Sequence, residues 1–279
     1  MTGLYQYYDH RSFRTILLHS IREYASFVNE LGEKKYLYRG QSNPAWSLEN
    51  SFLRLHNEYK EKGLSPPGER EMIENFRNNA VKYGGLDDDF ESLREIDLLG
   101  IMQHYGVKTR MLDFTECPFI AAYFALNARL QSIEEPLFFT GAVFFIHKDL
   151  VTWDLPEEAI SKFWVFSKQK KSGISYSLFA LKPNNYSGRL KSQRAIFLFM
   201  HDPFLSYEYK IQIEKTWYNI RALSQSEKGT AFPPVWKVVF RMPISELAIF
   251  FNALTERGID ERKLYPDFQG FCSSLNFPK

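Results

Sequence analysis

Residues 103–115 read QHYGVKTRMLDFT and place a dense set of polar side chains between two segments with the composition of buried helices. The upstream segment follows the acidic run at residues 87–89, has apolar residues at helical spacing and ends near Gly106. The downstream segment, residues 117–130, is largely apolar and carries Pro118 in its first turn, where the missing N–H costs little. Buried polar groups must find partners or lose about 1–3 kcal/mol each. The fold therefore has to provide those partners, or the stretch forms a site.

Two interpretations of residues 103–115 follow. In the structural one, the polar groups satisfy one another, and Asp113 caps the next helix and pairs with Arg110. In the functional one, the same groups converge on a ligand, because polar networks of this kind also occur at active sites. The residues alone leave both interpretations open.

The distribution of helical and strand patterns predicts the fold class. Apolar spacing typical of helices covers residues 16–31, 68–83, the two segments beside residues 103–115, and 244–255. Runs of β-branched and aromatic residues, typical of strands, cover residues 35–40, 142–146, 177–181, 195–200, 209–213 and 236–241. We therefore expect an α+β fold with a helix-rich N-terminal half, one early strand, and a mixed or antiparallel sheet in the C-terminal half. No linker-like segment divides the chain, so we expect a single domain over residues 1–279.

Composition excludes several classes of protein. The 279 residues carry 35 Lys and Arg against 33 Asp and Glu, a net charge of +2, and 44% are hydrophobic, which is too apolar for a disordered chain. The two distant cysteines, Cys117 and Cys272, make no disulfide framework and indicate a reducing compartment. Neither a secretory leader nor an apolar run of the roughly 20 residues that a membrane span needs is visible. We expect a soluble cytoplasmic protein with no membrane partner.

The small net charge conceals a basic segment, residues 162–194, which has interleaved aromatic residues and no Asp or Glu. Its cations are Lys162, Lys168, Lys170, Lys171, Lys182, Arg189, Lys191 and Arg194. Such a segment can bind nucleic acid or a phosphorylated ligand. The alternative is a solvated basic face whose aromatic residues turn into the core.

A second polar motif, Tyr38-Arg39-Gly40-Gln41, lies at the end of the early strand. An arginine at a strand end, followed by glycine, can direct its guanidinium at a phosphate or carboxylate in two-pronged geometry. The alternative is a buried Arg39 that pairs with a carboxylate such as Asp113. The sequence contains no metal-binding spacing of His or Cys, no glycine-rich dinucleotide loop and no Walker loop, so we expect no metal site.

Together these motifs resemble the FRG domain family, which is named for an aromatic-Arg-Gly motif near its start. The resemblance extends along nearly the whole chain. Its residues are Tyr38-Arg39-Gly40-Gln41, Trp46, Leu48, Leu53-Arg54, Gln103-His104-Tyr105-Gly106, Thr109-Arg110, Leu112-Asp113, Thr115, Pro118, Ala121–Ala125, Arg189, Gln193, Phe197, Gly258-Ile259, Leu264-Tyr265-Pro266-Asp267 and Gly270. More distantly, FRG domains look similar to ADP-ribosyltransferase-like folds, which would imply a core of that kind.

By this similarity, the catalytic roles fall on Arg39, Thr109, Asp113 and Gln193. In ADP-ribosyltransferases the arginine holds a phosphate or ribose of NAD, a hydroxyl residue orients the nicotinamide side, and an acidic residue stabilises the oxocarbenium-like transition state. Gln193 takes the acidic position but cannot supply a full negative charge, so Asp113 or Glu116 would supply it. The further candidate ligand-binding residues are Gln41, Gln103, His104, Tyr105, Arg110, Thr115 and Glu116.

Three hypotheses about function result. The first is an FRG domain-containing protein with NAD as co-substrate, an ADP-ribosyltransferase-like or NAD-glycohydrolase effector of the kind that serves as a toxin or in phage defence. The second is a non-catalytic module that binds a nucleotide, or nucleic acid through residues 162–194. The third is a structural interaction domain in which Arg39 and Asp113 form a buried pair. Convergence of the candidate residues on one solvent-reachable cleft would favour a site.

Overall fold

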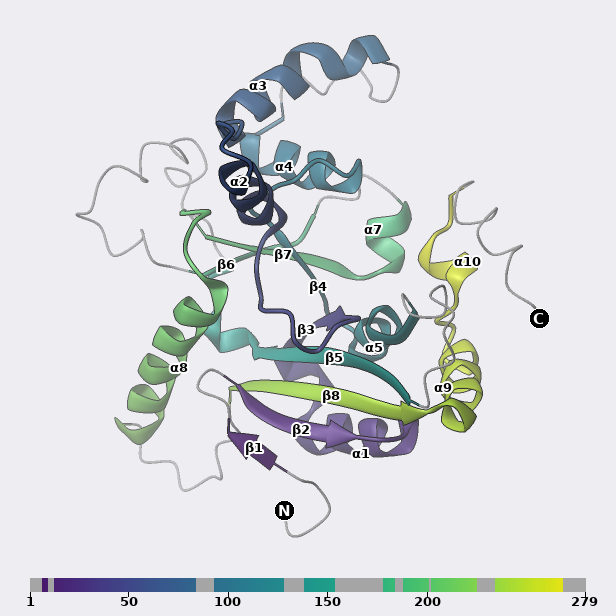
Figure 1. Cartoon of the computed structure of the whole chain (residues 1–279). Helices are drawn as coiled ribbons and strands as arrows, with labels where there is room; N and C mark the ends of the chain where they lie inside the picture. Colours follow the sequence, from purple (N-terminus) through teal and green to yellow (C-terminus); the bar gives the residue numbers. More distant parts are fainter. Residues whose placement is uncertain are drawn as a thin grey trace.

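A mixed β-sheet organises the computed structural model, which describes residues 7–9, 13–83, 93–127, 138–153, 178–183, 188–200, 202–224 and 234–267. Within these residues the sheet has eight strands in the order β1-β2-β8-β5-β3-β4-β7-β6 (Figure 1). The strands are β1 (Tyr7–Asp9), β2 (Arg14–Leu18), β3 (Tyr36–Gln41), β4 (Leu112–Thr115), β5 (Phe138–His147), β6 (Phe179–Leu181), β7 (Ala195–Phe199) and β8 (Val235–Pro243). Strands β2 and β8 run parallel, and the other neighbouring pairs are antiparallel.

Helices lie on both faces of this sheet (Figure 1). They are α1 (Ile21–Leu31), α2 (Ser51–Glu61), α3 (Glu69–Asn79), α4 (Glu95–His104), α5 (Pro118–Asn127), α7 (Gly188–Ser192), α8 (Tyr207–Ser224), α9 (Ile244–Glu256) and α10 (Glu261–Leu264). Buried residues of α1, α5 and α9 share one apolar cluster with β2, β5 and β8, whereas α8 packs into a second cluster. Helix α4 packs with β6 and β7 in a third cluster.

Strands β3 and β5 show why the middle of the sheet is apolar on both sides. Tyr38 and Phe145 belong to the cluster that contains α1 and α5, while Leu37 and Phe144 belong to the cluster that contains α8. Successive side chains of a strand point to opposite faces, so a strand covered on both faces is buried at nearly every position. The run 142–146 is therefore continuously apolar instead of alternating with polar residues.

The structure confirms the α+β class and the mixed sheet, and it corrects the distribution of strands. Strands β1, β2 and β4 join β3 in the first half of the chain, so the sheet takes strands from both halves and the prediction of one early strand undercounts them. The predicted helix over residues 16–31 is a strand followed by a helix. Ser20 separates the two because its hydroxyl accepts a hydrogen bond from the N–H of Glu23 and caps α1.

The predicted strand at residues 209–213 is wrong, because this segment lies within helix α8. Its tyrosine and two isoleucines favour a strand by composition, but Tyr207, Lys210 and Ile211 are buried, which is helical spacing. The predicted helix at residues 244–255 and the strands at 142–146, 195–200 and 236–241 are confirmed, and so is the predicted helix 117–130 over Pro118–Asn127, beyond which its last residues lie outside the described ones. The acidic run at residues 87–89 lies outside the described residues.

Helix α5 crosses β3 and β5 at two glycines. A Cβ atom on Gly40 would lie 2.0 Å from the carbonyl oxygen of Ala121, and one on Gly141 would lie 2.3 Å from that of Ala125. Both distances are far inside van der Waals contact, and the opposing atoms belong to the helix backbone. The glycine of the Tyr38-Arg39-Gly40 motif is thus required by the packing of α5 on the sheet.

We predict that Gly40→Ala destabilises the protein by about 1–3 kcal/mol or more, because the added methyl must push the backbone of α5 away from β3. Urea unfolding followed by circular dichroism measures this change. Gly188→Ala is the matched control, since its Cβ would meet only Pro266 Cγ at 3.4 Å, and we expect a change within about 0.5 kcal/mol. Equal stability of the two variants would contradict the tight packing at Gly40.

Candidate functional site

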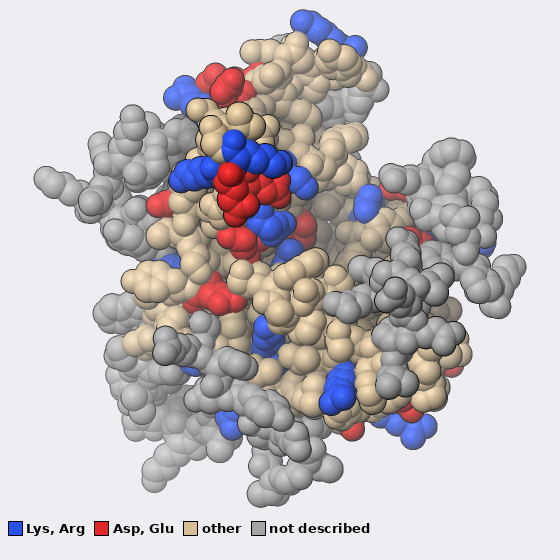
Figure 2. Space-filling view, in the orientation of Figure 1, with Lys and Arg blue, Asp and Glu red and all other residues tan. Residues whose placement is uncertain are grey.

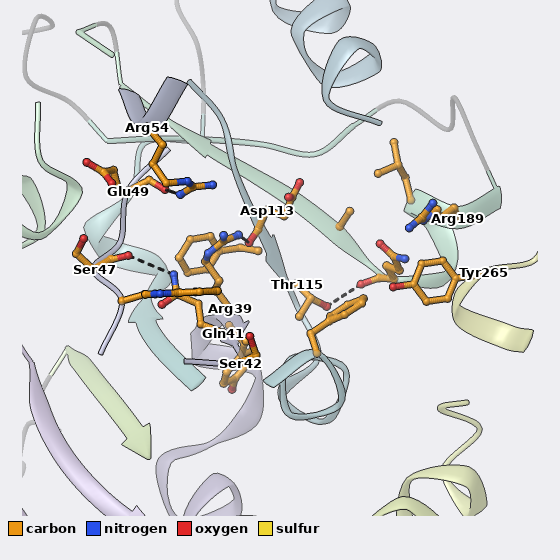
Figure 3. Close-up of a pocket in the computed structure, with 18 residues that line it drawn as sticks. Arg39, Gln41, Ser42, Ser47, Glu49, Arg54, Asp113, Thr115, Arg189 and Tyr265 are labelled. Carbon is orange, nitrogen blue, oxygen red and sulfur yellow. Dashed lines mark hydrogen bonds between the residues drawn. The ribbon is translucent and has the colours of Figure 1, made fainter. Parts of the chain in front are cut away.

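A cleft of about 700 Å³ opens beside the ends of β3 and β4. Its volume lies in the range of small-molecule binding sites. Strand β3, the loop after it, α2, β4, α5, α7 and the segment after α10 contribute to its wall (Figure 3). The lining residues are Tyr38, Arg39, Gly40, Gln41, Ser42, Trp46, Ser47, Glu49, Arg54, Asp113, Phe114, Thr115, Phe124, Arg189, Leu190, Gln193, Ala195 and Tyr265. Four predicted site residues of the central motifs therefore meet here, namely Arg39, Gln41, Asp113 and Thr115, together with Gln193 from farther along the chain.

Arg39 and Asp113 lie next to each other in the cleft (Figure 3). Strand β3 pairs with β4 at Tyr38 and Thr115, and this register brings the two side chains together. The Nη1 atom of Arg39 donates a hydrogen bond of 2.7 Å to the backbone oxygen of Asp113, not to its carboxylate. Burial lowers the pKa of Arg39, and the Asp113 charge opposes this, but an arginine stays protonated at neutral pH. Arg39 therefore keeps its positive charge and does not donate a hydrogen bond to the carboxylate of Asp113 beside it.

A short hydrogen-bond relay orients the Asp113 carboxylate. The Nε2 atom of Gln103, at the end of α4, donates to Asp113 Oδ1 at 2.6 Å. The hydroxyl of Thr109 in turn donates to Gln103 Oε1, which fixes the direction of the amide. Thr109 is fully buried and does not line the cleft, so its hydroxyl acts through Gln103.

The surrounding protein also changes the acidity of Asp113. Partial exclusion of water by the cleft walls raises the pKa of this carboxyl group, whereas Arg39 and the Gln103 hydrogen bond act in the opposite direction. The net shift is upward. The side chain is nevertheless open to solvent within the cleft, so a ligand can reach it.

Gln41 presents an unused acceptor at the cleft. Its side chain is only 7% exposed, and its Nε2 atom donates to the backbone oxygen of Ser47 at 3.3 Å. Its Oε1 atom is buried without a hydrogen-bond partner. An unsatisfied buried acceptor costs about 1–3 kcal/mol, a cost that a donor on a ligand would remove.

Thr115 and Gln193 line the cleft, and the side chain of each already makes a hydrogen bond within the protein. The Thr115 hydroxyl donates to the backbone oxygen of Gln193 at 2.7 Å and accepts from the N–H of Cys117 at 3.1 Å. It thus links β4 to the segment that leads into α5, whereas the expected cap of this helix, Asp113, bonds instead to Gln103. The Nε2 atom of Gln193 donates to the backbone oxygen of Leu264 at 3.2 Å, which leaves its Oε1 atom as the group that can meet a ligand.

Several cleft residues were not among the predicted site residues, although most belong to the family pattern. Arg54 donates from Nη1 to the backbone oxygen of Glu49 at 2.6 Å, and the guanidinium of Arg189 stacks 4.2 Å from the ring centre of Tyr265. Trp46 is 56% exposed at the rim. Their spacing along the chain carries no signal, because the loop after β3, helix α2 and the segment after α10 are brought together only by the tertiary fold.

Arg110 is not part of the cleft. It is 1% exposed, its Nε atom donates to Glu69 Oε2 at 2.6 Å, and its backbone N–H donates to Glu69 Oε1 at 2.9 Å. The expected pairing of Arg110 with Asp113 is therefore wrong. Arg110 does not line this cleft, and its contact with a ligand stays a prediction. The partner of Arg110 is a buried acid at the first residue of α3, forty-one positions earlier in the chain.

Glu116 and the end of α4 also lie outside the cleft lining. Glu116 is paired with Lys148 at 3.0 Å; partial burial raises the pKa of its carboxyl, but Lys148 and Lys182 outweigh that effect and lower it. Burial and Arg189 lower the pKa of His104, which Asp267 opposes. Tyr105 is 58% exposed and lines a separate apolar groove with residues of α3.

The remaining predictions concern metals, membranes and the basic segment. In the described ranges, no three His, Cys, Asp or Glu side chains gather in a way that could hold a metal ion. None of the described helices combines the length and apolar character needed to cross a bilayer. Most of the segment 162–194 lies outside the described residues, so its role in binding nucleic acid stays a prediction. Elsewhere, acidic and basic side chains intermix on the surface over α2 (Figure 2).

We predict that Glu69→Ala destabilises the protein by about 3–5 kcal/mol, because it leaves the Arg110 guanidinium buried without a counter-charge. Arg39→Ala should cost far less, since Arg39 pairs with no carboxylate and its main hydrogen bond goes to a backbone oxygen. Thermal and urea unfolding of both variants measure the difference. A larger loss for Arg39→Ala would favour the hypothesis that Arg39 is a structural residue.

Comparison with known proteins finds one family. Residues 34–134 match the model of the FRG domain. This range contains β3, the loop that follows it, α2, α4, β4 and α5, whereas Arg189, Gln193 and Tyr265 lie beyond it. No curated protein and no solved structure matches the chain.

Proposed function

We propose that the cleft of this chain, whose residues 34–134 match the FRG domain, binds NAD and cleaves the bond between nicotinamide and ribose, with ADP-ribose passing to water or to an acceptor. The proposal rests on one observation: three arginines that form no ion pair with the described residues and one oriented carboxylate line the same cleft. The first feature suits a diphosphate, and the second suits a developing positive charge. Both are needed for chemistry on NAD.

The arginines provide the site for phosphate. Within the described residues, Arg39, Arg54 and Arg189 make no ion pair with a carboxylate, and the opposing acids of the cleft wall are Glu49 and Asp113. Arg39 and Arg54 each use one Nη atom on a backbone oxygen, so further N–H groups remain. A guanidinium with free donors binds phosphate oxygens in two-pronged geometry.

Aromatic side chains provide surfaces for the rings of a nucleotide. Trp46 and Tyr265 both line the cleft; Trp46 is largely exposed, and Arg189 stacks against the ring of Tyr265. Bases stack on aromatic rings and on arginine planes for about 1–3 kcal/mol each. These side chains can therefore hold ring systems, while Arg39 and Arg54 lie beside Asp113 (Figure 3).

Asp113 is the carboxylate that we assign to the chemical step. As the C1′–N1 bond breaks, its electron pair leaves with nicotinamide and positive charge develops on the ribose. A carboxylate held in a fixed direction stabilises that charge, and water or an acceptor hydroxyl then attacks C1′ and releases a proton. Glu116 is less suited because Lys148 already neutralises it, and Gln193 carries no charge. Thr109 and Gln103 act as positioning residues for Asp113.

Such an activity would suit an effector that acts on cellular NAD as a toxin or in phage defence. The proposal is consistent with a protein that works in the cytoplasm, where NAD is abundant. Expression of the chain in cells followed by measurement of total NAD tests this part, and a stable NAD pool would contradict a glycohydrolase role.

We predict that the purified chain releases nicotinamide from NAD and that Asp113→Asn lowers kcat by about 10²–10³, because it removes the charge that faces the transition state. Arg54→Ala should raise KM with a smaller effect on kcat, since Arg54 is assigned to phosphate. Chromatography of nicotinamide, with and without candidate acceptors, measures both. The matched control is Arg70→Ala, which removes an exposed arginine of α3 that is paired with Glu74.

The outcomes separate the hypotheses. Binding of NAD without release of nicotinamide would contradict the catalytic proposal and support a non-catalytic nucleotide-binding module. Equal activity of Asp113→Asn and the wild type would remove Asp113 from the mechanism. Circular dichroism of each variant establishes that the fold is retained.

We also predict a pH dependence. Asp113 must be ionised to stabilise the cation, so activity is present above the pKa of its carboxyl and is lost as pH falls through it. Because the cleft raises this pKa, the acid limb should lie above the value of about 4 that is usual for aspartate. Gln103→Leu removes a hydrogen bond that lowers the pKa, so its acid limb should move to higher pH. A profile of kcat/KM that is the same for both proteins would contradict the relay.

A further inference from the structure

A second cavity, of about 130 Å³, adjoins the cleft and shares Arg39, Arg54 and Asp113 with it. The loop after α4 closes its other side and contributes Lys108. We propose that this cavity, which we call the side pocket, binds a phosphate monoester attached to the nucleotide in the main cleft. This inference rests on the proposed function and specifies its substrate as the NADP class of dinucleotide rather than NAD.

The charges of the side pocket favour a dianion. Lys108 is exposed, and its side chain makes no hydrogen bond or ion pair with the described residues. Arg39 and Arg54 keep donors free after their bonds to backbone oxygens. The opposing charge is Asp113, whose Oδ1 atom already accepts from Gln103. Three cations thus surround a small space that holds one carboxylate, and a phosphate group would complete the balance of charge.

The other polar side chains of the side pocket, those of Ser51 and Gln103, already form hydrogen bonds within the protein. The Ser51 hydroxyl donates to the backbone oxygen of Thr109 at 3.1 Å and accepts from the Thr109 N–H at 3.0 Å. The Gln103 amide bonds to Asp113 with its nitrogen and to Thr109 with its oxygen. The remaining walls include Val107, Met111 and Leu112. A neutral amide such as nicotinamide would therefore find few free partners here, whereas an anion meets unpaired cations.

Size and position agree with a single substituent. The side pocket has less than a fifth of the volume of the main cleft, so it suits one small group and not a second ring system with its sugar. Because Arg39 and Arg54 line both cavities, one ligand can extend from the cleft into the side pocket. The monoester of NADP is carried by the adenosine ribose, whereas the bond to nicotinamide is on the other ribose. The proposal therefore requires a folded dinucleotide, with the monoester in the side pocket and the nicotinamide ribose on the main-cleft side of Asp113.

Calorimetric titration of the full chain with NAD and NADP at constant ionic strength tests the proposal. We expect the wild type to bind NADP about tenfold more tightly than NAD. Lys108→Ala should abolish this preference and leave the Kd for NAD unchanged, because Lys108 does not line the main cleft. Lys191→Ala is the matched control: it removes an exposed lysine that lines neither cavity, so the preference should persist.

Inorganic phosphate, added as a competitor, separates a local site from a general effect of charge. Phosphate that weakens NADP binding more than NAD binding supports the side pocket. Equal Kd values for NAD and NADP in the wild type, or equal losses in Lys108→Ala and Lys191→Ala, would overturn the proposal. The result is independent of catalysis: a preference for NADP without release of nicotinamide supports the side pocket while contradicting the enzyme, and release of nicotinamide without the preference does the reverse.

Discussion

The close approach of helix α5 to strands β3 and β5 is the constraint on which the cleft depends. With glycine at positions 40 and 141, the helix backbone lies where side chains would otherwise stand. Because side chains alternate along a strand, Arg39 and Gln41, on either side of Gly40, point away from α5, and both line the cleft. The glycine of the motif therefore accommodates α5, while the arginine before it is directed to the cleft.

Within residues 109–115, Arg110 makes buried contacts of the core, whereas Asp113 lines the cleft. Arg110 binds Glu69 at the start of α3, and its backbone oxygen accepts a hydrogen bond of 2.6 Å from the hydroxyl of Tyr207 on α8. These hydrogen bonds fix the backbone just before β4. Asp113, three residues after Arg110, is therefore held in place in the wall of the cleft. A buried ion pair contributes little net stability compared with apolar packing. Residues 109–115 thus supply both a buried ion pair of the core and a carboxylate that lines the cleft.

The sequence predicted the fold class, the core helices and the central strands, because their burial on one or both faces leaves a periodic apolar pattern. One of the alternatives that the sequence left open placed Arg39 beside Asp113; the two residues do lie together, but Arg39 bonds to the backbone oxygen of Asp113 and not to its carboxylate. It could not predict that Arg110 pairs with Glu69 or that Arg54, Arg189 and Tyr265 reach the same cleft. Those contacts join segments far apart in the chain, and no local spacing encodes them. The prediction of a strand at residues 209–213 was wrong because the composition of this segment is typical of a strand, whereas its buried residues have helical spacing.

The position of Asp113 bears on how the cleft differs from the ADP-ribosyltransferase pattern. In that pattern a later strand edge supplies the acid. The resemblance would give this position to Gln193, whose Nε2 atom donates to the backbone oxygen of Leu264. Among the described residues that line the main cleft, the acids are Glu49 and Asp113, which lie on the side of Arg39 and Arg54 (Figure 3). In the proposed reaction, a cation that develops on the ribose would be stabilised from the β4 side, next to Arg39 and Arg54, which we propose bind the phosphates. Asp113 would then face the developing charge itself, so that the reaction would need no acid at position 193.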